Sequence, residues 1–270
     1  MKRILVTGVT SGIGRALFTH FVNEGHFVIG VARNKEKIDS LRQSMKKDTF
    51  KIYQSDFASL KSLRSLTNTI LEEYSGGLDI LINNAGIVQS DKTFTKDGFE
   101  LQYQVNHLSV VHMSLALYPL LKKRDGKVII TGSEAHKKAK FVEKDIEATR
   151  HYHALRSYAR TKLYNLMFAH WFNDSKDAVS CYVVSPGRVK TGIGTKETSK
   201  FHALFWKLFT LIGQKPKEVV QTYDYLIDTP KESLNETYYH NALPEVESPV
   251  AKEKSNVHAL MKKTLSDLKL

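Results

Sequence analysis

The sequence predicts a doubly wound α/β fold, in which one parallel β-sheet is covered by helices on both faces. Short apolar runs with the length of buried strands alternate along the chain with longer segments in which apolar residues recur at helical spacing. This alternation is typical of parallel strands joined by crossover helices. No Pro/Gly/Ser-rich linker, low-complexity tract or other repeat divides the 270 residues, so we expect a single domain over residues 1–270.

The expected strands and helices follow one another regularly up to residue 184. The apolar runs that predict strands are 4–6, 27–32, 50–53, 78–83, 127–131 and 179–184. The segments that predict helices are 16–22, 38–45, 60–71, 105–121 and 158–172. A glycine-rich turn lies between the first strand and the first helix, which is where a parallel sheet binds its ligand.

Residues 196–270 are expected to form a substrate flap and a helical C-terminal extension. Apolar stripes at helical spacing run over 201–209 and 257–268, and simple packing against the domain explains both. For 201–212 two further alternatives remain open, because its aromatic residues, which include Trp206, are interrupted by His202 and Lys207. It could close over an apolar substrate, or lie as an amphipathic helix on a membrane surface.

Composition excludes several classes of protein. An apolar fraction of 41% with 25% charged residues is that of a globular chain, not a disordered one. The net charge of +12 is spread without a basic block, so we expect no nucleic-acid partner. Cys181 is the single cysteine, the histidines are scattered, and no apolar run reaches 18 residues. We therefore expect no disulfide, no metal, no membrane span, and a cytoplasmic location.

The glycine-rich turn after the first strand has the pattern of a phosphate-binding loop. Gly8 suits a tight turn, Gly12 lets the main chain approach a pyrophosphate, and Gly14 allows close packing of helix on strand. The N-terminus of the following helix offers unpaired N–H groups to an anion. The turn predicts a Rossmann-type dinucleotide site with these contact residues: Gly8, Thr10, Ser11, Gly12, Ile13 and Gly14.

Two arginines favour NADP(H) over NAD(H). Dinucleotide sites that select NAD place an acid after the second strand to bind the ribose hydroxyls. Here Ala32 and Arg33 occupy that place, and Arg15 follows the glycine turn. Two guanidinium groups without a carboxylate suit a 2′-phosphate, because arginine binds phosphate through a charged fork.

A tyrosine and a lysine are spaced to share one helix face. Tyr158 and Lys162 are at positions i and i+4, and Ser133 follows the fifth strand at the expected ligand edge of the sheet. A free tyrosine titrates near pH 10, too high for acid–base work at neutral pH. We expect the lysine ammonium, together with an oxidised nicotinamide, to lower the tyrosine pKa.

Taken together, these motifs make the sequence resemble the short-chain dehydrogenase/reductase family over nearly its whole length. The motifs that carry the resemblance occur in the family's order: Thr7-Gly8-x3-Gly12-x-Gly14, Asp56, Asn83-Asn84-Ala85-Gly86, Asn106, Ser133, Tyr158-x3-Lys162 and Pro186-Gly187-x-Val189-x-Thr191. The catalytic helix and the segment 238–249 are similar to those of the retinol dehydrogenase-like and WW-domain oxidoreductase-like branch. Glu134 departs from it by placing a charge beside the substrate serine.

The resemblance implies a role for each motif. Tyr158 is the implied general acid and base, Ser133 binds the substrate oxygen, Lys162 holds the nicotinamide ribose, and Asn106 helps to hold a water in a proton relay. The remaining implied cofactor contacts are Asp56 with Phe57 at the adenine, Asn83, Ala85 and Gly86 at the sheet edge, and Pro186, Gly187, Val189 and Thr191 beside the nicotinamide.

These observations predict an enzyme that moves a hydride between NADP(H) and a carbonyl or alcohol. Its expected substrate is a small apolar molecule such as a lipid aldehyde, a retinoid or a steroid. The resemblance also implies a homo-oligomer. The alternative is a regulatory protein that keeps the fold and binds NADP(H) without turnover.

Overall fold

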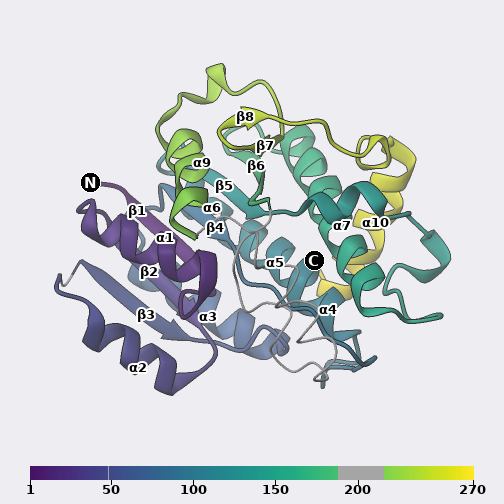
Figure 1. Cartoon of the computed structure of the whole chain (residues 1–270), viewed down its shortest axis with the longest axis horizontal. Helices are drawn as coiled ribbons and strands as arrows, with labels where there is room; N and C mark the ends of the chain where they lie inside the picture. Colours follow the sequence, from purple (N-terminus) through teal and green to yellow (C-terminus); the bar gives the residue numbers. More distant parts are fainter. Residues whose placement is uncertain (48, 188–215) are drawn as a thin grey trace.

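The computed structural model describes residues 1–47, 49–187 and 216–270, and its strands form one sheet (Figure 1). The strand order is β3-β2-β1-β4-β5-β6-β7-β8, parallel from β3 to β7 and antiparallel only at β8. The strands are β1 (Arg3–Thr7), β2 (Phe27–Ala32), β3 (Phe50–Gln54), β4 (Ile80–Asn83), β5 (Lys127–Thr131), β6 (Ser180–Ser185), β7 (Tyr238–His240) and β8 (Leu243–Pro244). The predicted α/β fold class is confirmed.

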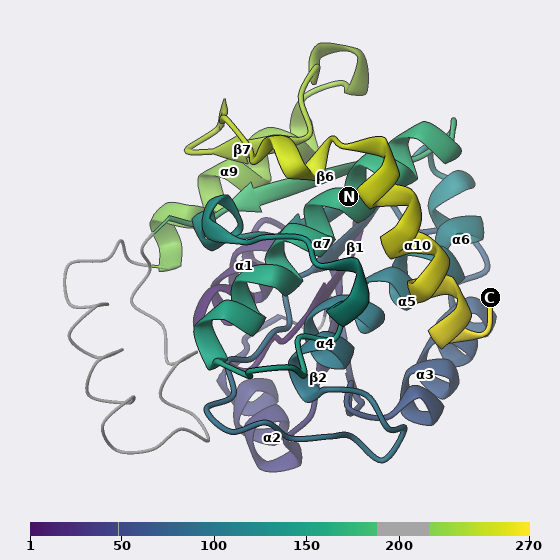
Figure 2. The same cartoon turned by 90° about the vertical axis from the view of Figure 1, so that its right-hand side faces the viewer.

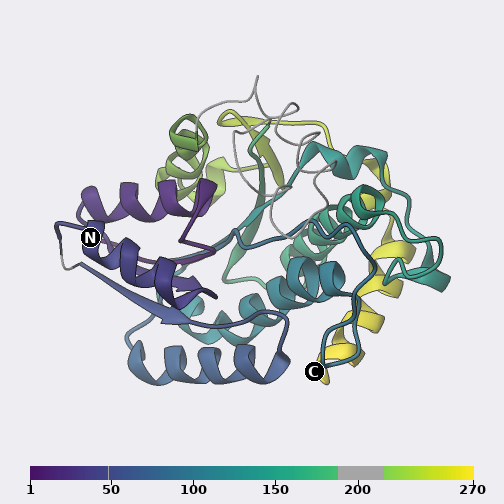
Figure 3. The ribbon, with the colours of Figure 1, turned by 60° about the horizontal axis from the view of Figure 1, so that its bottom comes forward.

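Helices cover both faces of this sheet, as Figure 3 shows with α1 and α9 above it and the blue and teal helices below it. The α-helices are α1 (Gly12–Asn23), α2 (Lys35–Ser44), α3 (Leu60–Glu73), α4 (Leu101–Tyr103), α5 (Ser109–Ala116), α6 (Tyr118–Lys122), α7 (Ala154–Ser175), α9 (Pro216–Asp228) and α10 (Lys254–Leu268). The shorter helical segments are a π-helix, η1 (Gln104–Leu108), and the 3₁₀ turns η2 (Glu134–Lys138), η3 (Glu143–Asp145), η4 (Lys231–Ser233) and η5 (Pro249–Ala251).

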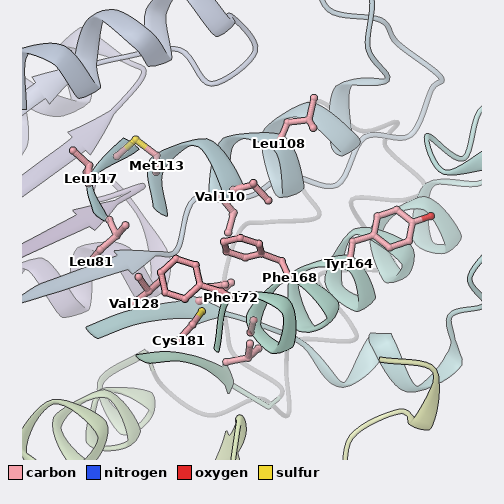
Figure 4. Close-up of a cluster of buried hydrophobic side chains, with 14 of the residues drawn as sticks. Leu81, Leu108, Val110, Met113, Leu117, Val128, Tyr164, Phe168, Phe172 and Cys181 are labelled. Carbon is pink, nitrogen blue, oxygen red and sulfur yellow. The ribbon is translucent and has the colours of Figure 1, made fainter. Parts of the chain in front are cut away.

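The core lies in two layers because alternate residues of each strand point to opposite faces. In β1, Leu5 belongs to the layer under α3, α5, α7 and α10, whereas Ile4 and Val6 belong to the layer under α1, α2 and α9. Figure 4 shows the first layer, where Phe168 and Phe172 of α7 pack between α5 and the sheet. Burial on both faces explains why the strands are continuously apolar.

The C-terminal elements extend this sheet and its helical layers. β7 pairs with β6 in register, from Val183 opposite Tyr238 to Ser185 opposite His240. The predicted stripe of 257–268 is helix α10, whose buried side chains include Leu260 and Met261. It lies along α7 (Figure 2), so packing against the domain is confirmed. The candidate flap at 201–212 lies outside the described residues.

One expected helix, 105–121, is divided into several pieces. The chain passes from α4 through the π-helix η1 into α5, and α6 starts separately with Pro119 as its second residue. Proline has no N–H for a helix interior, so a fresh start at this place is favourable. The π-helix contains Asn106, and its geometry belongs to the site described below. Within the described parts of the chain, no helix is both long and apolar enough to cross a membrane.

A buried carboxyl group joins this divided segment to α7. Glu100, fully buried before α4, accepts hydrogen bonds at Oε2 from the Tyr103 N–H (2.8 Å) and the Ser157 hydroxyl (3.4 Å). Burial raises the pKa of Glu100 from 4.5 to about 7, and the nearby Glu147 carboxylate also raises it. The folded protein therefore holds this proton more tightly than the unfolded chain does.

We predict that Glu100 makes folding less stable as the pH rises. A raised folded pKa gives stability that is complete below pH 4.5 and is lost as the pH passes through about 7, a loss of roughly 3 kcal/mol. Urea unfolding at pH 5 and pH 8 should show this loss in the native protein and a flatter profile in Glu100→Gln. The exposed Glu143→Gln is the control. Equal pH slopes in Glu100→Gln and the native protein would contradict the assignment.

Candidate active site

The glycine turn between β1 and α1 has a shape that only glycine allows. Gly8 and Gly12 have φ of +78° and +56°, in the left-handed region. The Gly8 N–H donates to the Val31 carbonyl at 2.7 Å, which joins the turn to the end of β2. A methyl group on Gly14 would lie 2.3 Å from the Gly8 carbonyl oxygen, so the close approach of α1 predicted for this glycine is confirmed.

Asn84 ties the turn to the neighbouring strand ends. Its Nδ2 donates to the Thr7 carbonyl at 2.8 Å, and its Oδ1 accepts from the Thr131 hydroxyl at 3.3 Å. Thr7 Oγ1 accepts from the N–H groups of Asn84 and Ala85 at 2.9 and 3.0 Å. Its neighbour Asn83 instead donates to Ser114 of α5, inside the core. The resemblance implied that residues 83–86 support this edge of the sheet, and the side chain that makes the cross-link is that of Asn84.

The predicted adenosine-side residues lie at the carboxyl ends of neighbouring strands. Arg15 is exposed in the first turns of α1, and Arg33 is exposed immediately after β2. Asp56 follows β3 and is also exposed, while its Oδ1 accepts from the Ala58 N–H at 3.1 Å. Phe57 is buried. β1, β2 and β3 are adjacent and parallel, so these residues share one edge of the sheet with the glycine turn.

A dinucleotide fits this edge. The turn would be filled by a Cβ at Gly14, and the first-turn N–H groups of α1 have no acceptors within the helix. Thr10, Ser11 and Ile13 belong to the same turn and are partly exposed, which leaves them accessible to a phosphate. From β1 the strand order runs outward through β2 to β3, whereas from β4 it runs in the opposite direction through β5 to β6. The order therefore reverses between the neighbouring strands β1 and β4, and ligands bind at such a switch point.

Ser133 and Tyr158 meet at the carboxyl end of β5. Ser133 is the N-cap of η2, where its Oγ accepts from the Ala135 N–H at 3.2 Å. Tyr158, on the first turns of α7, lies close enough to the Ser133 hydroxyl for that hydroxyl to lower the pKa of the phenol. The structure thus brings together two residues that are 25 positions apart in the chain, as the sequence predicted for a site at this edge.

Lys162 lies beneath this pair. Its Nζ is 5.5 Å from the centre of the Tyr158 ring and donates to the Thr131 carbonyl at 2.7 Å. Burial lowers the pKa of Lys162 to about 8 and raises the pKa of Tyr158 to about 12. Desolvation of the phenolate is the larger effect on Tyr158 in the chain alone. The predicted lowering of the tyrosine pKa includes the charge of an oxidised nicotinamide and stays a prediction.

Asn106 links the segment after β4 to α7. Its Oδ1 accepts from the Ile87 N–H at 2.8 Å, and its Nδ2 donates to the Ile87 carbonyl at 2.9 Å and to Thr161 Oγ1 at 3.2 Å. A methyl group on Gly86 would lie 3.3 Å from Asn106 Oδ1 and 3.8 Å from Lys162 Nζ. A side chain at position 86 would therefore contact both of these polar atoms.

The last predicted motif begins directly after β6. Gly187 has φ of +64°, and a methyl group there would lie 2.8 Å from the His240 ring. His240, at the end of β7, hydrogen-bonds the Ser185 carbonyl through Nδ1 at 2.9 Å. His240 was not among the predicted site residues, because its place depends on the pairing of β7 with β6. Pro186 is partly exposed beside Gly187, and Val189 and Thr191 lie outside the described residues.

The assembled groups are suited to proton transfer beside a dinucleotide. A neutral phenol, a serine hydroxyl and a mostly protonated lysine lie next to a loop shaped for a pyrophosphate. Among the residues that the structure describes, no three His, Cys, Asp or Glu side chains are grouped so that they could hold a metal ion.

Comparison with known proteins agrees with this geometry. The family model described as short chain dehydrogenase matches residues 2–201. Retinol dehydrogenase 14 from Mus musculus is 28% identical, covering 94% of this chain and 82% of its own length. Dehydrogenase/reductase SDR family member 13 from Homo sapiens is 30% identical, covering 96% of this chain and 71% of its own.

Solved structures share the fold. A short-chain dehydrogenase from Sphingobium yanoikuyae in complex with NADPH has a TM-score of 0.68 at 21% identity, covering 99% of this chain and 96% of its own. An alcohol dehydrogenase from Thermococcus sibiricus complexed with 5-hydroxy-NADP has a TM-score of 0.69 at 19% identity, covering 91% and 100%. With the family match over 2–201, these findings show that the chain belongs to the short-chain dehydrogenase family of oxidoreductases and is similar to its retinol dehydrogenase-like branch.

Proposed function

We propose that the protein is an NADP(H)-dependent oxidoreductase that transfers a hydride between the nicotinamide and an apolar carbonyl or alcohol substrate. The observation that carries the proposal is the convergence of Ser133, Tyr158 and Lys162 at the sheet edge that also holds the glycine turn. Relatives named as retinol dehydrogenases support an apolar alcohol or aldehyde as the substrate class. A reducing compartment such as the cytoplasm suits the buried free thiol of Cys181.

When bound, the nicotinamide supplies or accepts the hydride. In the direction of reduction, the neutral Tyr158 phenol donates its proton to the substrate oxygen, and the Ser133 hydroxyl donates a hydrogen bond to the same oxygen. The Lys162 ammonium stabilises the phenolate that remains. A water beside Gly86, in contact with Lys162 and Asn106, would give the route by which the proton is replaced.

The preference for NADP(H) is supported by the charge at the β1 and β2 ends. Arg15 and Arg33 are exposed there, and β2 is followed by Arg33 and Asn34 where an acid would bind the ribose of NAD. An arginine fork binds a phosphate dianion through two charged hydrogen bonds.

We predict that the protein binds NADPH more tightly than NADH and that the arginines cause the difference. Each of Arg15→Ala and Arg33→Ala should weaken NADPH binding by about 10-fold or more, because each removes a charge-assisted hydrogen bond, and should leave NADH binding nearly unchanged. Calorimetric titration with both nucleotides measures this. Arg124→Ala is the control, since its guanidinium donates to the Gly76 carbonyl near the amino edge of the sheet. Equal affinity of the native protein for both nucleotides would refute the NADP(H) preference.

We predict that Tyr158→Phe lowers kcat for carbonyl reduction by about 10²-fold or more, because it removes the proton donor. NADPH affinity should change less than twofold. The matched control is Tyr164→Phe on the same helix, where the lost hydroxyl donates to the Ile146 carbonyl away from the site. Turnover that survives in Tyr158→Phe would overturn the assignment. A native protein that binds NADPH and reduces no member of a broad carbonyl panel would favour the non-catalytic alternative.

We predict that Gly86→Ala lowers kcat by about 10-fold or more without loss of NADPH affinity. The added methyl group would fill the space between Asn106 Oδ1 and Lys162 Nζ, and Gly86 has no left-handed φ that would strain an alanine. Gly76→Ala, whose methyl group would make only ordinary contact at 3.6 Å, is the control for adding a methyl group. If affinity falls and kcat does not, Gly86 serves the cofactor and not the proton route.

A further inference from the structure

A fully buried histidine follows Asn106 in the π-helix and contacts two helices from distant parts of the chain. His107 Nδ1 is 3.1 Å from Oδ1 of Asn165 on α7. Its Nε2 is 3.0 Å from the hydroxyl of Thr264 on α10. All three side chains are at most 1% exposed. Figure 2 shows α10 lying beside α7, so the C-terminal helix reaches the active-site segment through a polar contact in the interior.

The hydrogen-bond partners fix the direction of each bond. Asn165 Nδ2 donates to the main-chain carbonyl of Asn106 at 2.9 Å, so its Oδ1 is the end that faces His107 and must accept. His107 therefore carries its hydrogen on Nδ1, and Nε2 is an acceptor. The Thr264 hydroxyl donates to it. The result is a continuous chain of donors from Thr264 through His107 and Asn165 to the Asn106 carbonyl.

His107 holds this arrangement as a neutral ring. Burial lowers its pKa to about 4, so it does not take up a proton near neutral pH. Because Nε2 is enclosed, its lone pair depends on the Thr264 hydroxyl as a donor. Removing that hydroxyl would leave a buried acceptor unsatisfied, which is more costly than the loss of an exposed hydrogen bond.

This series of hydrogen bonds ends at Asn106, the residue on which the proposed proton route depends. Asn106 lies in a π-helix, a rare form of helix that frequently occurs at functional sites. Its side chain is held by Ile87 and Thr161, and its main-chain carbonyl is held by Asn165. A shift of Asn165 would therefore move Asn106 relative to Lys162.

We propose that His107, Asn165 and Thr264 are positioning residues for Asn106. Through these residues, helix α10 helps to hold the active site in its geometry. None of the three reaches the reacting atoms. The role of α10 goes beyond apolar packing, since Thr264 is its buried polar contact to the π-helix. The part of this inference that concerns turnover rests on the proposed function.

The test compares three variants of α10 in the full-length protein. Thr264→Val removes the hydroxyl at nearly constant volume and should lower kcat by about 10-fold, with KM and NADPH affinity changed less than twofold. Thr264→Ser keeps the hydroxyl and should restore kcat to within twofold of the native value. Met261→Ala, also buried on α10 but outside the hydrogen-bonded chain, should lower thermal stability and leave kcat unchanged well below its melting temperature.

A second measurement does not depend on turnover. Hydrogen exchange of residues 104–108 should be faster in Thr264→Val than in either the native protein or Met261→Ala. Nitrogen NMR of His107 should show its hydrogen on Nδ1 and no titration from pH 5 to pH 8.

Two results would overturn the inference: loss of kcat in proportion to lost stability in both Thr264→Val and Met261→Ala, or unchanged exchange and unchanged kcat in Thr264→Val. If the native protein reduces no carbonyl but the exchange pattern is as expected, the proposed function fails and the positioning of Asn106 stands.

Discussion

Parallel hydrogen bonding from β3 to β7 is the constraint on which the site depends. Parallel strands cannot be joined by a tight hairpin, so each connection crosses a face of the sheet and returns the chain to the opposite edge. The carboxyl ends of the strands are thereby collected along one edge. The segments that leave β1, β4, β5 and β6 begin with or soon reach Gly8, Gly86, Ser133 and Gly187. Residues far apart in the sequence become neighbours for this reason alone.

Local patterns were sufficient to predict strands β1 to β6, the glycine turn and the shared helix face of Tyr158 and Lys162, because strand pleat, left-handed φ and helical spacing are properties of nearby residues. They did not predict β7 and β8, which are short and add to the edge that β6 offers. Local patterns were insufficient where a segment distant in sequence determines the direction of a side chain or the form of a helix. Asn83 and Asn84 are adjacent, yet one faces the core and the other the glycine turn, according to the pleat of β4. The π-helix lies where the Asn106 side chain forms hydrogen bonds with the main chain of Ile87. Such a contact cannot be predicted from the spacing of apolar residues along a helix.

Burial acts on Tyr158 and Lys162 in opposite directions and favours the neutral form of each. The two pKa shifts have different consequences for the charge of each group at neutral pH. A tyrosine with a pKa of about 12 is a phenol, whereas a lysine with a pKa of about 8 is still mostly an ammonium. The chain by itself therefore presents a proton donor with a positive charge beneath it. This charge state is the one that the proposed reduction of a carbonyl uses, with Tyr158 as the proton donor.

The C-terminal helices reach the site from opposite faces of the sheet, each through a buried hydroxyl. On one face, Tyr223 of α9 donates to the Thr131 hydroxyl at 2.8 Å, since Thr131 itself donates to Asn84. The Thr131 carbonyl in turn accepts from Lys162. On the other face, Thr264 of α10 begins the chain that ends at the Asn106 carbonyl. Lys162 and Asn106 both lie near Gly86, so the two helices together hold the side chains on which the proposed proton route depends.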